Sequence, residues 1–414
     1  MSTRVALTLL TLCASAVSFF ANTLLLRNFG ASVALDRVYF SANIPLALAG
    51  LVSGSLLYLL PPRFTQITPR VQDSTVRVLF ILFAIVCSVA VLVELAFGFI
   101  RDQIFVAVLG IGFTLVALLM VLCTLFTCTA QARGSYLSTG IAPMIISTGL
   151  LGGVMLGVAF HAEWGLLIGY FLGSTVASLW LGRTLGMVFL LRWRDLILAR
   201  AALRKLKPHL VNIVMGTMAF TLFQPIDVVL CSSLSGGSLS LMSYAQRVVV
   251  AASVAVNLGS HTIAALTARE SLLEGGERAL KRLANHEVLR IVGFGLLVWM
   301  GFTLLGGHRL LGALLSSSAM VSNDFNQLVE CMQWMLLGVG PMAAIPYLFR
   351  IFYSQNVYDK PAILGIFVAL TYGFLSWLLI PRFGILALAY VYSAVWWLTL
   401  LAAIVWLNWP SAGE

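Results

Sequence analysis

Residues 238–268 read SLSLMSYAQRVVVAASVAVNLGSHTIAALTA, and Arg247 is the single formal charge among them. A transmembrane helix needs roughly 20 apolar residues at about 1.5 Å rise per residue, so this run is long enough to cross a bilayer. Arg247 would then lie about 13 Å below the membrane surface. A charge at such depth costs at least about 2.5 kcal/mol, so it normally faces a partner, a cavity or a substrate. The run therefore predicts a membrane helix with a functional arginine.

The composition assigns the whole chain to the membrane proteins. Of its 414 residues, 60% are hydrophobic and 10% are charged, whereas roughly 25% are charged in an average soluble domain. The apolar stretch after Arg4 continues to Leu26, beyond the roughly 7 to 15 residues of a signal-peptide core. The six cysteines show no spacing typical of a metal site or a disulfide framework. We predict an all-α polytopic membrane protein without a metal site.

Stretches of near-spanning length occur twelve times. They are residues 5–26, 38–60, 78–100, 104–130, 136–160, 165–191, 208–233, 238–268, 288–307, 327–349, 361–380 and 384–408. The N-terminus and the loops after even-numbered helices hold 18 of the 25 Lys and Arg residues, and the other loops hold five. The positive-inside rule therefore predicts that both termini are cytoplasmic. Topology and contact with anionic lipid explain the net charge of +10 without any binding of nucleic acid.

A basic linker divides the chain into two halves of similar length. We expect an N-terminal six-helix bundle at 1–191, a cytoplasmic linker at 192–207 and a C-terminal six-helix bundle at 208–414. Ser41-Ala42-Asn43 in the second helix corresponds by position to Tyr244-Ala245-Gln246 in the eighth. Parallel repeats of this kind predict two bundles around a central cavity. Chance similarity between two apolar sequences is the alternative.

The seventh predicted helix carries Gln224-Pro225-Ile226-Asp227 near its outer end. Proline removes a backbone hydrogen bond, so we expect a kink and a hinge at Pro225. An intramembrane aspartate must pair or titrate, and Arg247 would lie at a similar height. An Asp227–Arg247 pair could be a static lock between two helices. It could instead be a mobile pair that an anionic ligand breaks by competing for the arginine.

Further polar residues lie around the first helix turn. Arg27 ends the first predicted helix and Asp36 opens the second, where they are either ordinary interfacial charges or the outer rim of the cavity. Asn43 and Pro45 follow in the second helix, and Pro45 is a second candidate hinge. The sequence contains no GxxxxGKS/T, GxSxG or HExxH motif, so we expect a transporter without catalytic residues rather than an ATPase or a hydrolase.

Three stretches resemble the MviN/MurJ family of lipid II flippases, within the multidrug, oligosaccharide-lipid and polysaccharide exporters. They are Leu26 through Asp36 to Pro45, Ile226-Asp227 through Gly236-Gly237-Ser238 to Gln246-Arg247, and Arg350 to Gln355 followed by Asp359-Lys360-Pro361. The resemblance implies that Arg27, Asp36 and Arg247 line a cationic cavity for the diphosphate and sugar headgroup of a polyprenyl-linked substrate. Arginine suits this role because its planar fork holds phosphate oxygens in pairs and keeps its charge.

The chain also departs from the family pattern. Ala21-Asn22 and Ala49-Gly50 stand where the family has further arginines, and Gln246 replaces an acidic residue before the arginine. The chain has twelve predicted helices, whereas the lipid II flippases have two more. The resemblance therefore implies an anionic lipid-linked saccharide and leaves open which one.

We accordingly expect an alternating-access flippase of the bacterial inner membrane for a peptidoglycan precursor or an exopolysaccharide or O-antigen-type unit. Asp227, Gln246 and Asn43 would complete its substrate site around Arg247, Arg27 and Asp36. We expect no cofactor, and coupling to the membrane potential or to a monovalent ion. Membrane lipids and cell-envelope glycan assembly enzymes are its expected partners. A drug or small-solute exporter, a membrane-embedded glycan enzyme and a non-transporting scaffold are the alternatives.

Overall fold

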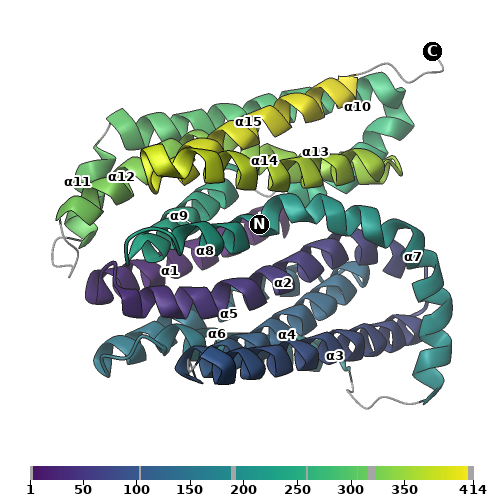
Figure 1. Ribbon diagram of the computed structural model, residues 1–414. Helices are drawn as coiled ribbons and strands as arrows, with labels where there is room; N and C mark the ends of the chain where they lie inside the picture. The colour runs from purple at the N-terminus through teal and green to yellow at the C-terminus, as the bar shows by residue number, and fades with distance from the viewer. Residues whose placement is uncertain are drawn as a thin grey trace. The chain divides into compact units, whose positions relative to one another are not determined.

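The computed structural model describes residues 3–101, 104–187, 193–257, 260–304, 306–315 and 322–408, and the regular structure in these ranges is helical (Figure 1). The chain divides into two compact units, Met1–Thr217 (unit 1) and Met218–Glu414 (unit 2). Unit 1 contains α1 (Thr3–Phe29), α2 (Val33–Phe64), α3 (Pro69–Arg101), α4 (Ile104–Ala132), α5 (Tyr136–Ala159), α6 (Gly165–Leu185) and most of α7 (Trp193–Thr221). Unit 2 contains α8 (Phe223–Cys231), α9 (Ser238–Asn257), α10 (Ser260–Leu304), α11 (Gly307–Leu315), α12 (Ser322–Leu337), α13 (Val339–Ser354), α14 (Asp359–Phe383) and α15 (Leu386–Asn408).

The predicted membrane-spanning segments agree with these helices, although α9 ends at Asn257, before the predicted end of its segment at residue 268. Within the described residues, ten helices are long and apolar enough to span a membrane, and two bent pairs raise the number to twelve. The bent pairs are His209–Thr221 with Phe223–Cys231, and Ser322–Leu337 with Val339–Ser354. They correspond to the predicted segments 208–233 and 327–349. The all-α polytopic fold expected from the composition is confirmed.

The two units repeat one packing pattern. In unit 1, α2 packs on α4, α3 packs on α4, α4 packs on α6 and α5 packs on α6. In unit 2, α9 and α10 pack on the bent pair α12–α13, that pair packs on α15, and α14 packs on α15. The pairing of helices along the chain is thus the same in each unit, which is what a duplicated bundle predicts.

Close helix packing in unit 1 depends on glycine. Gly149, Gly153 and Gly157 of α5 face Gly165, Gly169 and Gly173 of α6. A Cβ atom on Gly153 would lie 2.2 Å from the Gly169 backbone nitrogen. Small residues let membrane helices approach until their backbones touch, and van der Waals contact is the main attraction available in lipid.

Proline explains where the two bent spans break. The chain turns by 47° at Leu222 and by 41° at Gly338, and a proline follows each break by three residues. Pro225 and Pro341 cannot donate to the carbonyls four residues earlier, which are those of Thr221 and Leu337. The Leu337 carbonyl instead accepts a 3.1 Å hydrogen bond from Trp397 Nε1 of α15. At the second break, a tertiary contact therefore satisfies the carbonyl that the proline leaves open.

The boundary between the units lies inside α7, between Thr217 and Met218. The sequence predicted it at the basic stretch 192–207, and the part of that stretch from Trp193 onward is the first half of α7. Asp195 fastens this half to α3, because its carboxylate lies 2.9 Å from Arg77 Nη1 and accepts a 2.7 Å hydrogen bond from Ser74. The first half of α7 is thus held by ion pairing as part of unit 1.

Candidate functional site

The turn between α1 and α2 carries the first pair of predicted site residues. Arg27 lies exposed in the last turn of α1, and Asp36 lies half-buried in the first turn of α2. Gly30 ends α1 with a φ of 65°, and Ser32 caps α2 by accepting a 3.2 Å hydrogen bond from the Leu35 amide. A cation at a helix C-terminus and an anion at an N-terminus both favour the helix dipoles. Arg27 and Asp36 therefore place opposite charges at the two helix ends that this turn joins.

Asn43 and Pro45 lie deeper in α2. Asn43 is seven residues beyond Asp36, which is about two helical turns on the same face, and its side chain is buried. α2 continues through Pro45 as one helix, so a hinge at that position stays a prediction. Ser41 donates to the Val106 carbonyl of α4 at 3.2 Å, and Ser53 accepts from Thr124 of α4 at 2.9 Å. These two hydrogen bonds anchor α2, the helix that carries Asn43, to α4.

Unit 2 assembles three polar side chains from three helices. Asp227 of α8 accepts one hydrogen bond from Gln246 Nε2 of α9 and another from the hydroxyl of Tyr372 of α14. The two donors bind different carboxylate oxygens, and all three side chains are at most 6% exposed. Burying a carboxylate is costly unless it is hydrogen-bonded, and these two donors meet that requirement. We call Asp227, Gln246 and Tyr372 the Asp227 clamp.

Arg247 directly follows Gln246 and lies half-buried in α9. It is the tenth residue of that helix, as the sequence predicted. The two oxygens of Asp227 are engaged by Gln246 and Tyr372, so the predicted Asp227–Arg247 pair stays a prediction. The structure brings Asp227 and Gln246 together and presents Arg247 on the next position of the same helix.

Tyr372 is the member of the clamp that sequence reasoning missed. It lies in the apolar segment 361–380, 145 residues from Asp227, where a single tyrosine carries no local pattern. A buried tyrosine usually finds a partner for its hydroxyl, and a buried aspartate needs donors. These two requirements together were the signal available in the sequence.

The departures from the family pattern occupy packed positions. Ala21 and Ala49 are 0% and 1% exposed, and Asn22 is buried and donates to the Ser18 carbonyl at 2.7 Å. An arginine could not replace either alanine without opening the packing around it. At Ala21, Asn22 and Ala49, where the family has arginines, the side chains of this chain are therefore closely packed.

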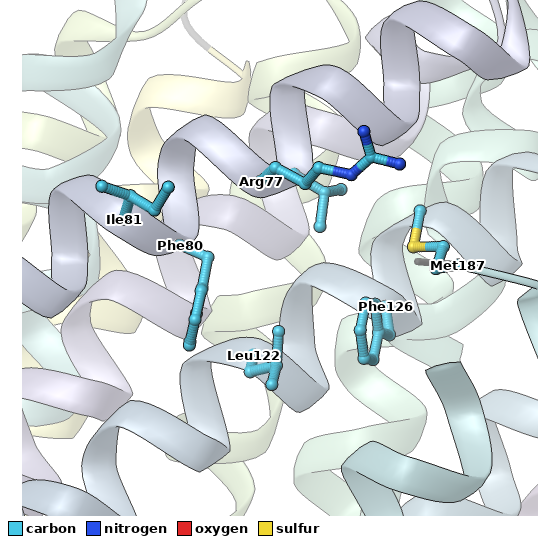
Figure 2. A pocket seen from close by; sticks show the side chains of 7 residues that line it. Arg77, Phe80, Ile81, Leu122, Phe126 and Met187 are labelled. Atoms are coloured by element: carbon cyan, nitrogen blue, oxygen red, sulfur yellow. The ribbon is translucent and has the colours of Figure 1, made fainter. Parts of the chain in front are cut away.

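A second polar cluster lies at the end of unit 1 that is predicted to be cytoplasmic. Arg133 lies 2.5 Å from Asp73, donates to Gln72 at 3.0 Å and donates to the Leu185 carbonyl at 3.3 Å. Beside Arg77 is a cavity of about 120 Å³ between α3, α4 and the residues after α6. Figure 2 shows its walls, formed by Val76, Arg77, Phe80, Ile81, Leu122, Phe126 and Met187. The predicted site residues are not among this lining.

Comparison with solved structures places this fold among known transporters. The inward closed conformation of the lipid II flippase MurJ matches with a TM-score of 0.79 and 14% identity, over 97% of this chain and 86% of that one. An inward-facing multidrug resistance MATE transporter matches with a TM-score of 0.70 and 12% identity, over 95% and 94% of the two chains. A MOP superfamily transporter from Pyrococcus furiosus matches with a TM-score of 0.70 and 14% identity, over 98% of this chain and 94% of that one.

Sequence comparison gives the family. No curated protein matches the chain. The family model described as "Lipid II flippase MurJ" matches residues 25–410, which is nearly the whole chain and includes the turn of Arg27 as well as the Asp227 clamp. The protein is therefore a polytopic membrane transporter and not an enzyme, and it belongs to the lipid II flippase MurJ family.

Proposed function

We propose that this protein flips a polyprenyl-diphosphate-linked or polyprenyl-phosphate-linked saccharide from the cytoplasmic to the outer leaflet of the bacterial inner membrane. The substrate class is a peptidoglycan precursor or an exopolysaccharide or O-antigen-type unit. The observation that carries the proposal is Arg247, a half-buried arginine in the middle of a membrane helix of a MurJ-family chain. Both termini are cytoplasmic in this proposal, as the distribution of basic residues predicts.

The chemistry of Arg247 suits an anionic headgroup. A guanidinium remains charged at any physiological pH and offers parallel N–H donors that match two phosphate oxygens. Its burial in a membrane helix is costly, and a phosphate ligand offsets that cost by supplying the opposite charge. Arg27, which is exposed at the end of α1, acts as a second phosphate contact, and Asp36 orients it when no substrate is bound. Asn43 offers an amide to the hydroxyl groups of the saccharide.

The membrane potential supplies a driving force for the alternating-access cycle. An inside-negative potential contributes about 2.3 kcal/mol per elementary charge per 100 mV. Arginines that bind a diphosphate move outward together with its negative charge, and the same arginines return inward without that charge. The potential then favours the return step. A monovalent ion is the alternative energy source, and the two are separated by replacing Na⁺ with K⁺ at constant potential.

The proposal is tested in proteoliposomes that contain a fluorescent polyprenyl-diphosphate saccharide. Accessibility of the label from each side measures flipping, and Arg247→Ala is compared with Arg382→Ala, which removes an exposed arginine at the end of α14. We expect Arg247→Ala to lose most flipping, and both Arg247→Lys and Arg382→Ala to retain more. Undiminished flipping by Arg247→Ala would refute the role of this arginine. Transport of a cationic drug without flipping of any saccharide lipid would favour the exporter alternative.

A further inference from the structure

Three helices of unit 2 meet at the Asp227 clamp, and each contributes one side chain. Tyr372 of α14 donates to Asp227 Oδ1, and Gln246 of α9 donates to Asp227 Oδ2. Buried hydrogen bonds are the most sensitive to loss of a partner, because the remaining polar group is left without water or donor. The clamp therefore fixes α8, α9 and α14 against one another at one level of the unit.

The clamp determines the direction of Arg247 through its neighbour. Successive residues of a helix point about 100° apart around its axis. Once the Gln246 amide is held on Asp227, rotation of α9 about its axis is restricted, and the direction of the next side chain follows. α9 also packs on α12 and α13. Its link to α8 includes the hydrogen bond from Gln246 to Asp227. A change at Asp227 should therefore change where the guanidinium of Arg247 lies.

The clamp is also joined to the bend between α7 and α8. Phe223, the first residue of α8, lies with its ring centroid 4.2 Å from that of Tyr372 and 5.3 Å from that of Trp396. Phe220, on the other side of the break at Leu222, stacks on Trp396 at 5.4 Å. The ring of Tyr372 thus packs on Phe223, directly after the break, while its hydroxyl donates to Asp227. The bend and the clamp are therefore joined by direct contact between Phe223 and Tyr372.

We infer that Tyr372 and Gln246 are positioning residues, which hold Arg247 in the orientation that binds phosphate and link that orientation to the bend at Leu222. The inference rests on the proposed function of Arg247. It assigns to Gln246 a role that an acidic residue could not fill in the same way. An ionised carboxylate at position 246 would accept hydrogen bonds only, so it would supply no donor to Asp227. The amide of Gln246 completes the clamp without a further charge.

Tyr372→Phe is the sharpest variant, because it keeps the ring that packs on Phe223 and removes only the hydroxyl. Its matched control is Tyr390→Phe, which removes a hydroxyl that donates to the carboxylate of Glu330 at 3.4 Å, outside the clamp. Gln246→Met removes the other donor at similar volume. Binding of polyprenyl diphosphate and of the uncharged polyprenyl alcohol is measured for each purified variant. Affinity for the alcohol measures only the lipid site. The additional affinity for the diphosphate measures the contribution of Arg247.

We expect Tyr372→Phe and Gln246→Met to weaken binding of the diphosphate about tenfold and to leave the alcohol unchanged. In an Arg247→Ala background the same substitutions should cause no further loss, because their effect passes through Arg247. Equal weakening of both ligands, or an undiminished loss in the Arg247→Ala background, would overturn the positioning role. Wild-type affinity of Arg247→Ala for the diphosphate would instead refute the proposed function itself, so the two failures are distinguishable.

Discussion

Unit 1 and unit 2 share one order of helix pairs but differ in how their helices cross the membrane. The spans of α1 to α6 are each continuous, although α2 and α5 contain Pro45 and Pro143. Both bent spans of the described residues break within unit 2, at Leu222 and Gly338. A proline is therefore not enough to break a span.

The comparison separates a rigid element from elements able to bend. Unit 1 is fastened by direct backbone contact between α5 and α6 and by ion pairs at one end of its helices. Unit 2 also has direct backbone contact, because a Cβ on Gly295 of α10 would lie 2.4 Å from the Cα of Gly340 in α13. Across its breaks, however, unit 2 is fastened by side chains, through the aromatic rings around Phe223 and the hydrogen bond of Trp397. Side-chain contacts can be exchanged one at a time, whereas backbone contact cannot. Conformational change is accordingly expected to be concentrated at the breaks of unit 2.

Gly153→Ala gives the largest expected loss, because it separates the two helices of unit 1 that touch most closely. Its new Cβ would lie 2.2 Å from the Gly169 nitrogen and 2.6 Å from the Gly165 carbonyl oxygen, and neither backbone atom can rotate away. We expect destabilisation by about 3 kcal/mol or failure to fold. Thermal unfolding in detergent measures it. Gly152→Ala, whose Cβ would meet no atom within 4 Å, is the matched control and should melt like the wild type.

Asp195→Ala should have the next largest effect, because it removes the carboxylate that fastens α7 to unit 1. The Arg77 side chain is 20% exposed and would lose its 2.9 Å partner. We expect a loss of about 2 kcal/mol, with partial recovery in Arg77→Met/Asp195→Leu, since an apolar pair leaves no unpaired charge. Glu277→Ala breaks a more exposed pair with Lys281 and should cost less than about 0.5 kcal/mol. Equal losses of stability for Asp195→Ala and Glu277→Ala would contradict the stabilising role of the Asp195–Arg77 ion pair.

The lengths of the apolar segments were enough to predict most of the fold. The segment predicted at 136–160 is α5, at Tyr136–Ala159, because a bilayer demands continuous apolar helix and the sequence has to supply it. The bend at Gly338 was not predicted. At this bend the Leu337 carbonyl accepts a hydrogen bond from Trp397, 60 residues away, and hydropathy does not register such a contact.

The site was predictable only in part, for a related reason. Asp227, Gln246 and Arg247 were evident as polar residues in apolar runs, and the structure joins the first two. Tyr372 and the Asp195–Arg77 pair were missed, because each bond joins residues more than 100 positions apart. Arg77 was counted only as a charge in a loop predicted to be cytoplasmic, and that count says nothing about its partner. Local sequence reveals the polar groups, and the fold decides how they pair.

Trp397→Phe should produce the smallest effect and tests whether the breaks of unit 2 are held by side chains. Removing the indole N–H leaves the Leu337 carbonyl without the donor that replaces the missing amide of Pro341. We expect a loss of about 1 kcal/mol in thermal unfolding, while Trp377→Phe, at an exposed position, should be neutral.

The double variant decides between a local repair and general packing at Trp397. Alanine at position 341 can donate its own N–H to the Leu337 carbonyl, so Trp397→Phe should cost almost nothing in a Pro341→Ala background. A cost of the same size in both backgrounds would mean that Trp397 stabilises α12 by packing alone. A cost that disappears would show that the bend at Gly338 persists because α15 supplies a replacement donor.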